Sequence, residues 1–311
     1  MSSDTALPPT PVQVVDSMER MSGGTYPGYR RSGARGVCFK GTFTPTGDAM
    51  GLTTAAHLQR RPVPVTVRFS NSEGNPQARD GVPVARGMAT RFALPDGGDT
   101  DLIALSVPVF VASTPEEFLT LTEALRPDAA TGHPDPARVQ AFVAAHPHLA
   151  EPITQQPPVP VSYGSAAYWA IHTFVWVDAA GNRQPVRYRW EPEAGRMDLT
   201  AEEAATRADH YLTAELHERL QDGPVAFTLQ VQLGEEGDPT HDPTVAWPET
   251  RKEITAGRLE LTAPVDDQER WAAQGFNPTW VTAGIELSDD PVLAFRAGAY
   301  PESLRRRGEH R

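Results

Sequence analysis

The sequence of 311 residues contains a single cysteine, Cys38. One cysteine cannot form an internal disulfide, and such sparse usage is typical of a reducing compartment. Residues 1–5 lack the basic start and apolar run of a secretory signal peptide. No apolar run approaches the roughly 20 residues that a membrane-spanning helix needs. We therefore expect a cytoplasmic protein that does not enter a membrane.

Basic residues are also scarce. The 28 Lys and Arg are outnumbered by 40 Asp and Glu, which gives a net charge of -12. This balance excludes a general nucleic-acid binder, because neutralising phosphates requires clustered basic side chains. The one dense basic run, residues 305–307, would by itself be a solvated tail. With 39% hydrophobic residues, the chain can still bury a sizeable core.

Several common catalytic and cofactor motifs are missing. There is no Gly-x-Gly-x-x-Gly, no Walker-type loop, no His-Glu-x-x-His and no Gly-x-Ser-x-Gly. Nine histidines are scattered along the chain, and the close pair His146 and His148 cannot share a helix face at a spacing of two. A zinc site there is therefore not expected.

Proline, by contrast, is abundant. Its 30 copies are about twice the usual share and predict long irregular connections. Apolar runs of β-branched character predict strands at residues 36–43, 63–70, 87–94, 102–111, 173–178, 186–190, 225–233 and 258–262. Helices are expected at residues 48–60, 115–125, 135–147, 200–221 and 290–306. This pattern predicts an α+β fold: an antiparallel barrel with helices in its connections and at the C-terminus.

The chain shows no internal repeat and no clear linker. Residues 1–28 are rich in Pro, Ser and Gly, and we expect them to form a loose N-terminal arm. Residues 29–311 are expected to form a single domain.

The last predicted helix carries an arginine four residues before a tyrosine, Arg296 and Tyr300. Side chains at this spacing lie on one face of a helix. A nearby cation stabilises phenolate over phenol, and a phenolate is a suitable ligand for ferric iron. Arg207 and Tyr211 repeat the spacing, but their neighbours predict an exposed helix face. At least one of the acids before this last helix, Asp289 or Asp290, should cap it.

Alternation along residues 65–70 places Arg68 and Ser70 on one face of a strand and Val67 and Phe69 on the other. Two polar residues on one face either meet solvent or line a cavity, and the strand alone leaves both readings open.

Short motif blocks follow one another through the chain in a fixed order: Val67-Arg68-Phe69-Ser70; Arg86-Gly87-Met88-Ala89 with Arg91-Phe92; Pro108-Val109-Phe110 with Phe118; His172-Thr173-Phe174; Asp242-Pro243-Thr244 with Trp247-Pro248; Phe276-Asn277-Pro278; Gly284-Ile285-Glu286; and Arg296 with Tyr300. Together, at compatible spacing from Tyr29 to Arg307, they resemble the haem-containing catalase family, most closely its small catalase-related members. The resemblance implies the catalase-type eight-stranded barrel with a C-terminal haem-binding helix.

Carried onto this sequence, the resemblance implies heme b as the cofactor and Tyr300 as the proximal iron ligand, held as phenolate by Arg296. His172 and Asp290 would orient Arg296. The haem propionates would be bound by three arginines, whose planar forks match carboxylates: Arg30, Arg68 and Arg307. Phe110 and Phe118 would lie beside the haem, with Phe118 stacked on one face, although an aromatic residue there could also be plain core.

The distal side departs from the family. Its Arg-x-x-His-Ala-Lys-Gly motif aligns with residues 30–36, which place Gly33 at the position of the catalytic histidine. A rival register would place Cys38 there, but only the Gly33 register keeps Gly41 and Phe43 in step with the family's Gly-x-Phe. Leu105 stands at the position of the distal asparagine of large catalases. Ser70, which would support the histidine, is present.

A missing proton shuttle should lower hydrogen peroxide disproportionation by about 10²–10⁴-fold while sparing haem binding. We therefore predict a haem-dependent oxidoreductase that uses peroxide to oxidise a small organic substrate, or that rearranges an organic hydroperoxide or N-oxygenated compound. The alternatives are a hydrogen peroxide-removing catalase or peroxidase, with Arg31 or Arg35 moving the proton, and a non-catalytic haem-binding protein. Arginine is a poor shuttle because it stays charged. The resemblance also implies a homodimer or larger homo-oligomer.

Overall fold

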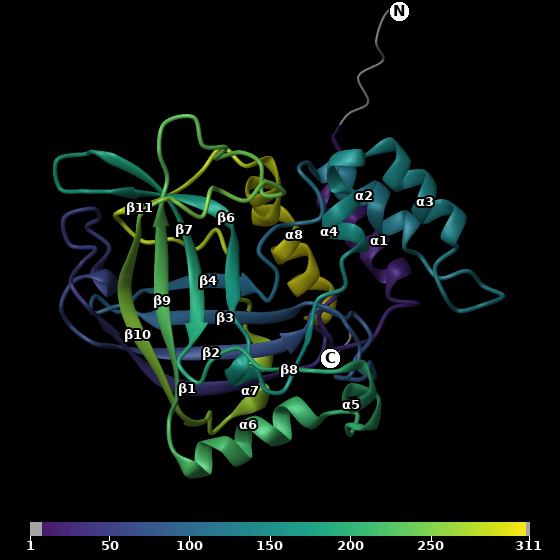
Figure 1. Cartoon of the computed structure of the whole chain (residues 1–311), viewed down its shortest axis with the longest axis horizontal. Coiled ribbons are helices and arrows are strands. Elements are labelled where there is room, and N and C mark those ends of the chain that lie inside the picture. Colours follow the sequence, from purple (N-terminus) through teal and green to yellow (C-terminus); the bar gives the residue numbers. More distant parts are fainter. Residues whose placement is uncertain (1–7, 309–311) are drawn as a thin grey trace, which may run out of the picture.

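A closed antiparallel β-barrel forms the centre of the computed structural model, which describes residues 8–308 (Figure 1). Within that range eight strands follow one another around the barrel in the order β6-β4-β3-β2-β1-β10-β9-β7, and β7 pairs back onto β6. These strands are β1 (Gly36–Pro45), β2 (Val63–Asn71), β3 (Arg86–Ala93), β4 (Asp99–Leu105), β6 (Tyr168–Val177), β7 (Arg183–Pro192), β9 (Val225–Leu233) and β10 (Glu253–Pro264). β11 (Ile285–Leu287) pairs antiparallel with β6, and β5 (Val159–Pro160) pairs with β8 (Asp198–Leu199).

The barrel interior is a packed core. In β9 every second side chain, from Val225 to Leu233, is buried, as strict alternation along a strand requires. Aromatic rings fill the centre; Phe43, for example, meets Phe92 edge to face at 5.2 Å between ring centroids. A cavity of about 20 Å³ beside His57 has room for about one water molecule. The functional residues predicted from the sequence gather on the outside of the barrel instead.

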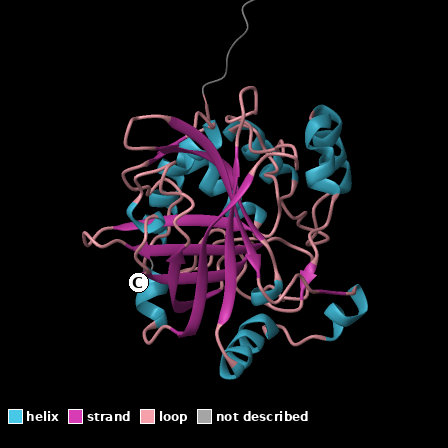
Figure 2. Cartoon of the chain, turned by 60° about the vertical axis from the view of Figure 1, so that its left-hand side comes forward, coloured by secondary structure: helices cyan, strands magenta, loops and turns pink. Residues whose placement is uncertain are grey.

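Helices cover the outside of the barrel, as the cyan ribbons in Figure 2 show. They are α1 (Pro11–Met21), α2 (Pro115–Ala124), α3 (Pro136–Ala145), α4 (Ala150–Thr154), α5 (Ala201–Thr206), α6 (Tyr211–Asp222), α7 (Gln268–Ala273) and α8 (Pro291–Gly308). In Figure 1 the yellow helix α8 lies between the barrel and the group formed by α1 to α4, and α8 packs against both α1 and α2.

The structure confirms the predicted α+β barrel, all eight of its strands, and the helices α2, α3 and α8. One strand was predicted too long: β4 ends at Leu105, because the chain then leaves the sheet and the Phe110 amide donates to the Pro243 carbonyl.

Two helix predictions were wrong in their extent. Residues 48–60 contain only a 3₁₀ turn, Ala56–Leu58, because the Thr53 hydroxyl and the Thr54 amide bind the carbonyls of Gly284 and Val177. The predicted helix 200–221 is broken into α5 and α6 at Arg207, which has an extended backbone.

The sequence predicts a loose N-terminal arm over residues 1–28, but part of this segment is helical. Residues 11–21 form α1, which begins with a capping box in which Thr10 and Gln13 bind each other's backbone amides. Val14, Val15 and Ser17 are buried on its inner face. Residues 1–7 of the predicted arm and residues 309–311 of the predicted domain lie outside the described range.

Candidate functional site

The outer face of β1 to β4 forms a platform of mostly small side chains. Residues paired directly across antiparallel strands project on the same face, so the pairing defines rows across the sheet. One row is Gly36, Ser70, Gly87, Leu105 and Trp169. The adjacent row is Cys38, Arg68, Ala89 and Ile103. Arg68 and Ser70 are each only 7% exposed, so the polar face of β2 does not face solvent.

The structure brings the predicted distal residues together. Gly33 is buried, and a side-chain Cβ built on it would lie 2.9 Å from Ser70 Oγ. Its φ of +62° is in the left-handed region, which favours glycine. Leu105 lies in the same row as Ser70. Backbone and a hydroxyl therefore meet here, and the apolar Leu105 lies two strands away from that hydroxyl, beyond Gly87.

Three predicted arginines converge next to this edge. Arg68 is 7% exposed and donates from Nη2 to the Gly33 carbonyl at 2.7 Å. Arg30 and Arg307 both donate to the carbonyl of Gln274, at 2.6 and 3.3 Å. Burial lowers the pKa of Arg30 well below its usual range, and the positive charges of Arg68 and Arg307 lower it further. Within residues 8–308, neither Arg30 nor Arg68 forms an ion pair with a carboxylate, so the charges of these two guanidiniums are not compensated by an acid there.

Helix α8 is fixed at its start by a buried acid. Asp290 accepts hydrogen bonds from the amides of Val292 and Leu293 at 2.8 and 3.1 Å, which confirms the predicted cap. Its other oxygen lies 2.5 Å from Nδ1 of His172 on β6. Burial lowers the pKa of His172 to about 4, and the charge of Arg296 adds to that effect. His172 is therefore neutral near pH 7, and with its proton on Nδ1 the ring offers a lone pair at Nε2.

The Arg296 and Tyr300 pair lies one turn further along α8. The guanidinium carbon of Arg296 is 5.8 Å from the centre of the Tyr300 ring and 5.4 Å from that of Phe110. Phe110 in turn stacks on Phe118 of α2, with centroids 5.5 Å apart. Nε2 of His172 is buried and has no hydrogen-bond partner among the described residues. Arg296 is close enough for its charge to lower the pKa of His172, but no hydrogen bond joins the two side chains among the described residues.

The duplicate pair, Arg207 and Tyr211, has different surroundings. Tyr211 is the first residue of α6 and is buried, with its hydroxyl donating to the Pro160 carbonyl at 2.5 Å. The predicted exposed helix face was therefore wrong for Tyr211, because the helix break at Arg207 turns the ring inward. Its phenol is engaged by the backbone of Pro160 instead of standing beside a guanidinium of the arginine cluster.

Sequence reasoning missed two arginines that hold the site's connections. Arg187 on β7 bonds Thr173 Oγ1 and the Val245 carbonyl and lies over the Trp247 ring, which links two of the motif blocks. Arg91 on β3 forms a two-bond pair with Asp101. It also binds the carbonyl of Gly275, in the segment that receives Arg30 and Arg307. In the sequence, Arg91 appears only as a member of the motif block that begins at Arg86, with no indication of its role. No pattern near Arg187 indicates a function for that residue.

Sequence comparisons show the family to which the chain belongs. The family model described as Catalase matches residues 12–310. The chain belongs to the catalase family. Its similar relatives include a catalase-related peroxidase of Mycolicibacterium paratuberculosis, 42% identical over 302 residues that cover 96% of this chain and 95% of that protein. A catalase-related peroxidase of Synechococcus elongatus is 35% identical over 303 residues, 96% of this chain and 88% of that protein. Catalase-2 of Bacillus subtilis is 30% identical over 291 residues, 87% of this chain and 42% of its own length.

The residues of this catalase-family site fit a haem. A flat macrocycle needs a floor of small side chains, which Gly87 and Ala89 provide in adjacent rows of the platform. Two propionates need compensating cations, and Arg30 and Arg68 lack carboxylate partners among residues 8–308. A phenol beside a guanidinium is a donor for ferric iron. None of the helices in residues 8–308 is long and apolar enough to cross a membrane.

Proposed function

We propose that this catalase-family chain binds heme b and acts as an oxidoreductase on peroxide. Tyr300 would ligate the iron, Arg296 would favour its phenolate form, and Asp290 and His172 would keep Arg296 in place. Arg30, Arg68 and Arg307 would bind the propionates. When bound, the haem supplies the redox chemistry for cleavage of a peroxide O–O bond. The names of the relatives and the convergence of these residues support the proposal.

The reaction we propose is oxidation of a small organic substrate by peroxide, or rearrangement of an organic hydroperoxide or N-oxygenated compound. Disproportionation of hydrogen peroxide would be weak. The observation that carries this choice is Gly33, which brings bare backbone against Ser70 where the family motif has a proton-shuttling histidine. Leu105 and Trp169 extend the row with apolar surface, which favours an organic substrate over a small polar peroxide.

The second candidate, efficient removal of hydrogen peroxide, needs another proton shuttle. Arg31 and Arg35 are the candidates for that role. Arg31 Nε pairs with Glu19 at 2.5 Å, and Arg35 Nη2 pairs with Asp80 at 2.5 Å. A guanidinium held by a carboxylate is stabilised in its charged form and cannot act as a base near neutral pH. Their ion pairs therefore favour the first candidate.

The haem assignment is tested by the optical spectrum of the protein reconstituted with heme b. We expect a Soret band in the natural chain, and a changed band position or loss of haem in Tyr300→Phe. Tyr211→Phe removes the phenol of the duplicate motif and is the matched control, which should leave the spectrum unchanged. A spectrum that is the same in Tyr300→Phe and in the natural chain would overturn Tyr300 as the ligand.

The reaction is tested by comparing oxygen evolution from hydrogen peroxide with consumption of cumene hydroperoxide. Oxygen evolution should be about 10²–10⁴-fold slower than in a catalase that has the distal histidine. Cumene hydroperoxide should be consumed with turnover. Rapid oxygen evolution would support the second candidate instead. Stable haem without turnover of either oxidant would leave only haem binding.

A further inference from the structure

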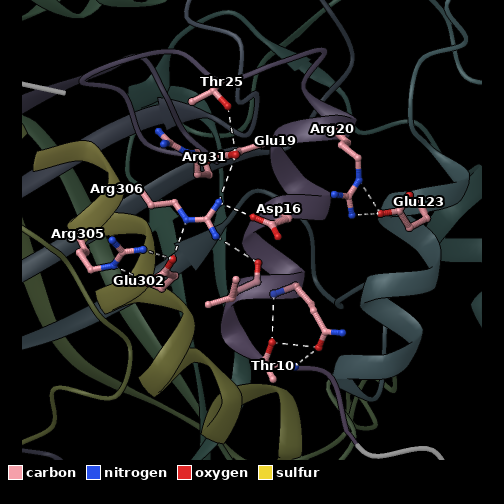
Figure 3. Close-up of polar contacts among 12 residues, drawn as sticks. Thr10, Asp16, Glu19, Arg20, Thr25, Arg31, Glu123, Glu302, Arg305 and Arg306 are labelled. Carbon is pink, nitrogen blue, oxygen red and sulfur yellow. Dashed lines mark hydrogen bonds and ion pairs between the residues drawn. The ribbon is translucent and has the colours of Figure 1, made fainter. Parts of the chain in front are cut away.

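A single carboxylate, that of Glu19 on α1, connects the two halves of the candidate site (Figure 3). Its Oε1 accepts a hydrogen bond from Nε of Arg31 at 2.5 Å, and its Oε2 lies 3.2 Å from Nη1 of Arg306. Arg31 lies in the segment that carries Arg30 and Gly33, whereas Arg306 is on α8, six residues after Tyr300. Glu19 thus touches the distal segment and the tyrosine helix at once.

This connection is shielded from water. The side chains of Arg31, Glu19 and Arg306 are 3%, 16% and 13% exposed. Charge pairs at such positions are screened far less by salt than pairs on an open surface. Arg306 is held further by Glu302 at 2.7 Å and Asp16 at 2.6 Å, so its guanidinium has a fixed geometry between α8 and α1.

Close packing brings α1 against α8 at a second point. A Cβ built on Gly298, midway between Arg296 and Tyr300, would lie 2.8 Å from Cγ of Pro11. The two helices therefore approach as closely as a glycine allows beside the tyrosine. On its other side α1 is joined to α2, the helix of Phe118, by the Ser17–Thr122 hydroxyl contact and the Arg20–Glu123 ion pair.

We propose that Glu19 is a positioning residue that fixes the distance between the segment of Arg30 and Gly33 and the helix of Tyr300. The N-terminal helix thereby sets the width of the haem site. The proposal rests on the proposed haem binding and goes beyond it, because Glu19 touches none of the groups assigned to the haem. Removing its charge leaves the buried Arg31 guanidinium without its carboxylate, and the strain is relieved by movement of residues 29–35 away from α8.

The test compares Glu19→Gln with Glu123→Gln, which makes the same change in an ion pair between α1 and α2 that contacts neither residues 29–35 nor α8. The first measurement is amide hydrogen exchange of the haem-free chain. In Glu19→Gln, exchange in residues 29–35 and 296–308 should rise by about 2- to 30-fold, the range expected for one link of a coupling network. In Glu123→Gln both regions should stay as in the natural chain.

The second measurement is the rate at which the haem-loaded chain loses haem to excess apomyoglobin, with the Soret position recorded beforehand. We expect faster loss in Glu19→Gln and partial recovery in Glu19→Asp, which keeps the charge. If Glu19→Gln does not fold, Arg31→Met replaces it: exchange should rise in residues 29–35 alone, because Glu19 still holds Arg306.

Equal exchange in Glu19→Gln and the natural chain would overturn the proposal, as would a rise spread evenly over the barrel. Failure of the natural chain to bind haem would overturn the proposed function instead, and the exchange measurement on the haem-free chain would still decide the role of Glu19.

Discussion

The substitution Gly33→Ala tests the geometry of the distal segment most directly. Gly33 has a φ of +62°, where a residue with a Cβ costs about 1–2 kcal/mol more than glycine. The new methyl would also lie 2.9 Å from Ser70 Oγ and 3.5 Å from the Asn71 carbonyl oxygen. Overpacking at a buried position adds about 1–3 kcal/mol. Gly33→Ala should therefore lower the free energy of unfolding by about 2–5 kcal/mol.

Urea unfolding of the haem-free chain measures this loss, and two further variants separate its causes. Gly132→Ala is the matched control, because Gly132 has a φ of +70° with nothing within 4 Å of its would-be Cβ. Gly132→Ala should therefore lower the free energy of unfolding only by the cost of the left-handed backbone conformation, about 1–2 kcal/mol. Adding Ser70→Ala to Gly33→Ala should recover the steric part, so the pair costs less than the sum of the single changes.

Equal losses in Gly33→Ala and Gly132→Ala would refute the close approach of Gly33 to Ser70. If the approach holds, it also limits what a restored histidine can do. Gly33→His carries the same strain and contact, so the segment must shift to accept it. Its gain in oxygen evolution should then fall short of the 10²–10⁴-fold typical of a well-placed general acid–base group.

Three other perturbations have defined outcomes. Arg30→Met should stabilise the haem-free chain, because it removes a buried charge repelled by Arg68 and Arg307, yet should speed haem loss; a lower melting temperature of the haem-free chain would contradict the like-charge cluster. Burial lowers the pKa of His57 to about 3, so between pH 6.5 and 3 the unfolded chain binds a proton that the folded chain does not, and the free energy of unfolding decreases as the pH is lowered. By pH 5 the loss is about 2 kcal/mol. Urea unfolding of His57→Leu should not show this loss. Gly298→Ala should destabilise α8 despite a helix-propensity gain of about 1 kcal/mol, because its methyl meets Pro11, and adding Pro11→Ala should reverse the sign in the same assay.

The predicted boundary between residues 1–28 and the domain, the homodimer or larger assembly, and the cytoplasmic location stay predictions. The helix α1 in that first segment packs on α2 and α8, and the family match begins within it, at residue 12. These contacts make α1 part of the same packed unit as the candidate site.

Local patterns in the sequence determined the barrel strands and the last helix. Alternation fixed which face of β2 carries Arg68 and Ser70, and a spacing of four placed Arg296 next to Tyr300, because both depend only on residues a few positions apart. The cap by Asp290 was readable for the same reason. The capping box at Thr10 was an equally local signal of α1, and the richness in Pro, Ser and Gly concealed it.

Only the tertiary structure decided the rest. Tyr211 repeats the arginine spacing of Tyr300, but a helix break fixed by contacts distant in sequence buries its phenol against Pro160. The gathering of Arg30, Arg68 and Arg307, the anchoring role of Arg187, and the bridge from Glu19 to both halves of the site join residues tens to hundreds of positions apart. Such contacts depend on how the helices close over the barrel, and no pattern within a few residues of any partner encodes that closure.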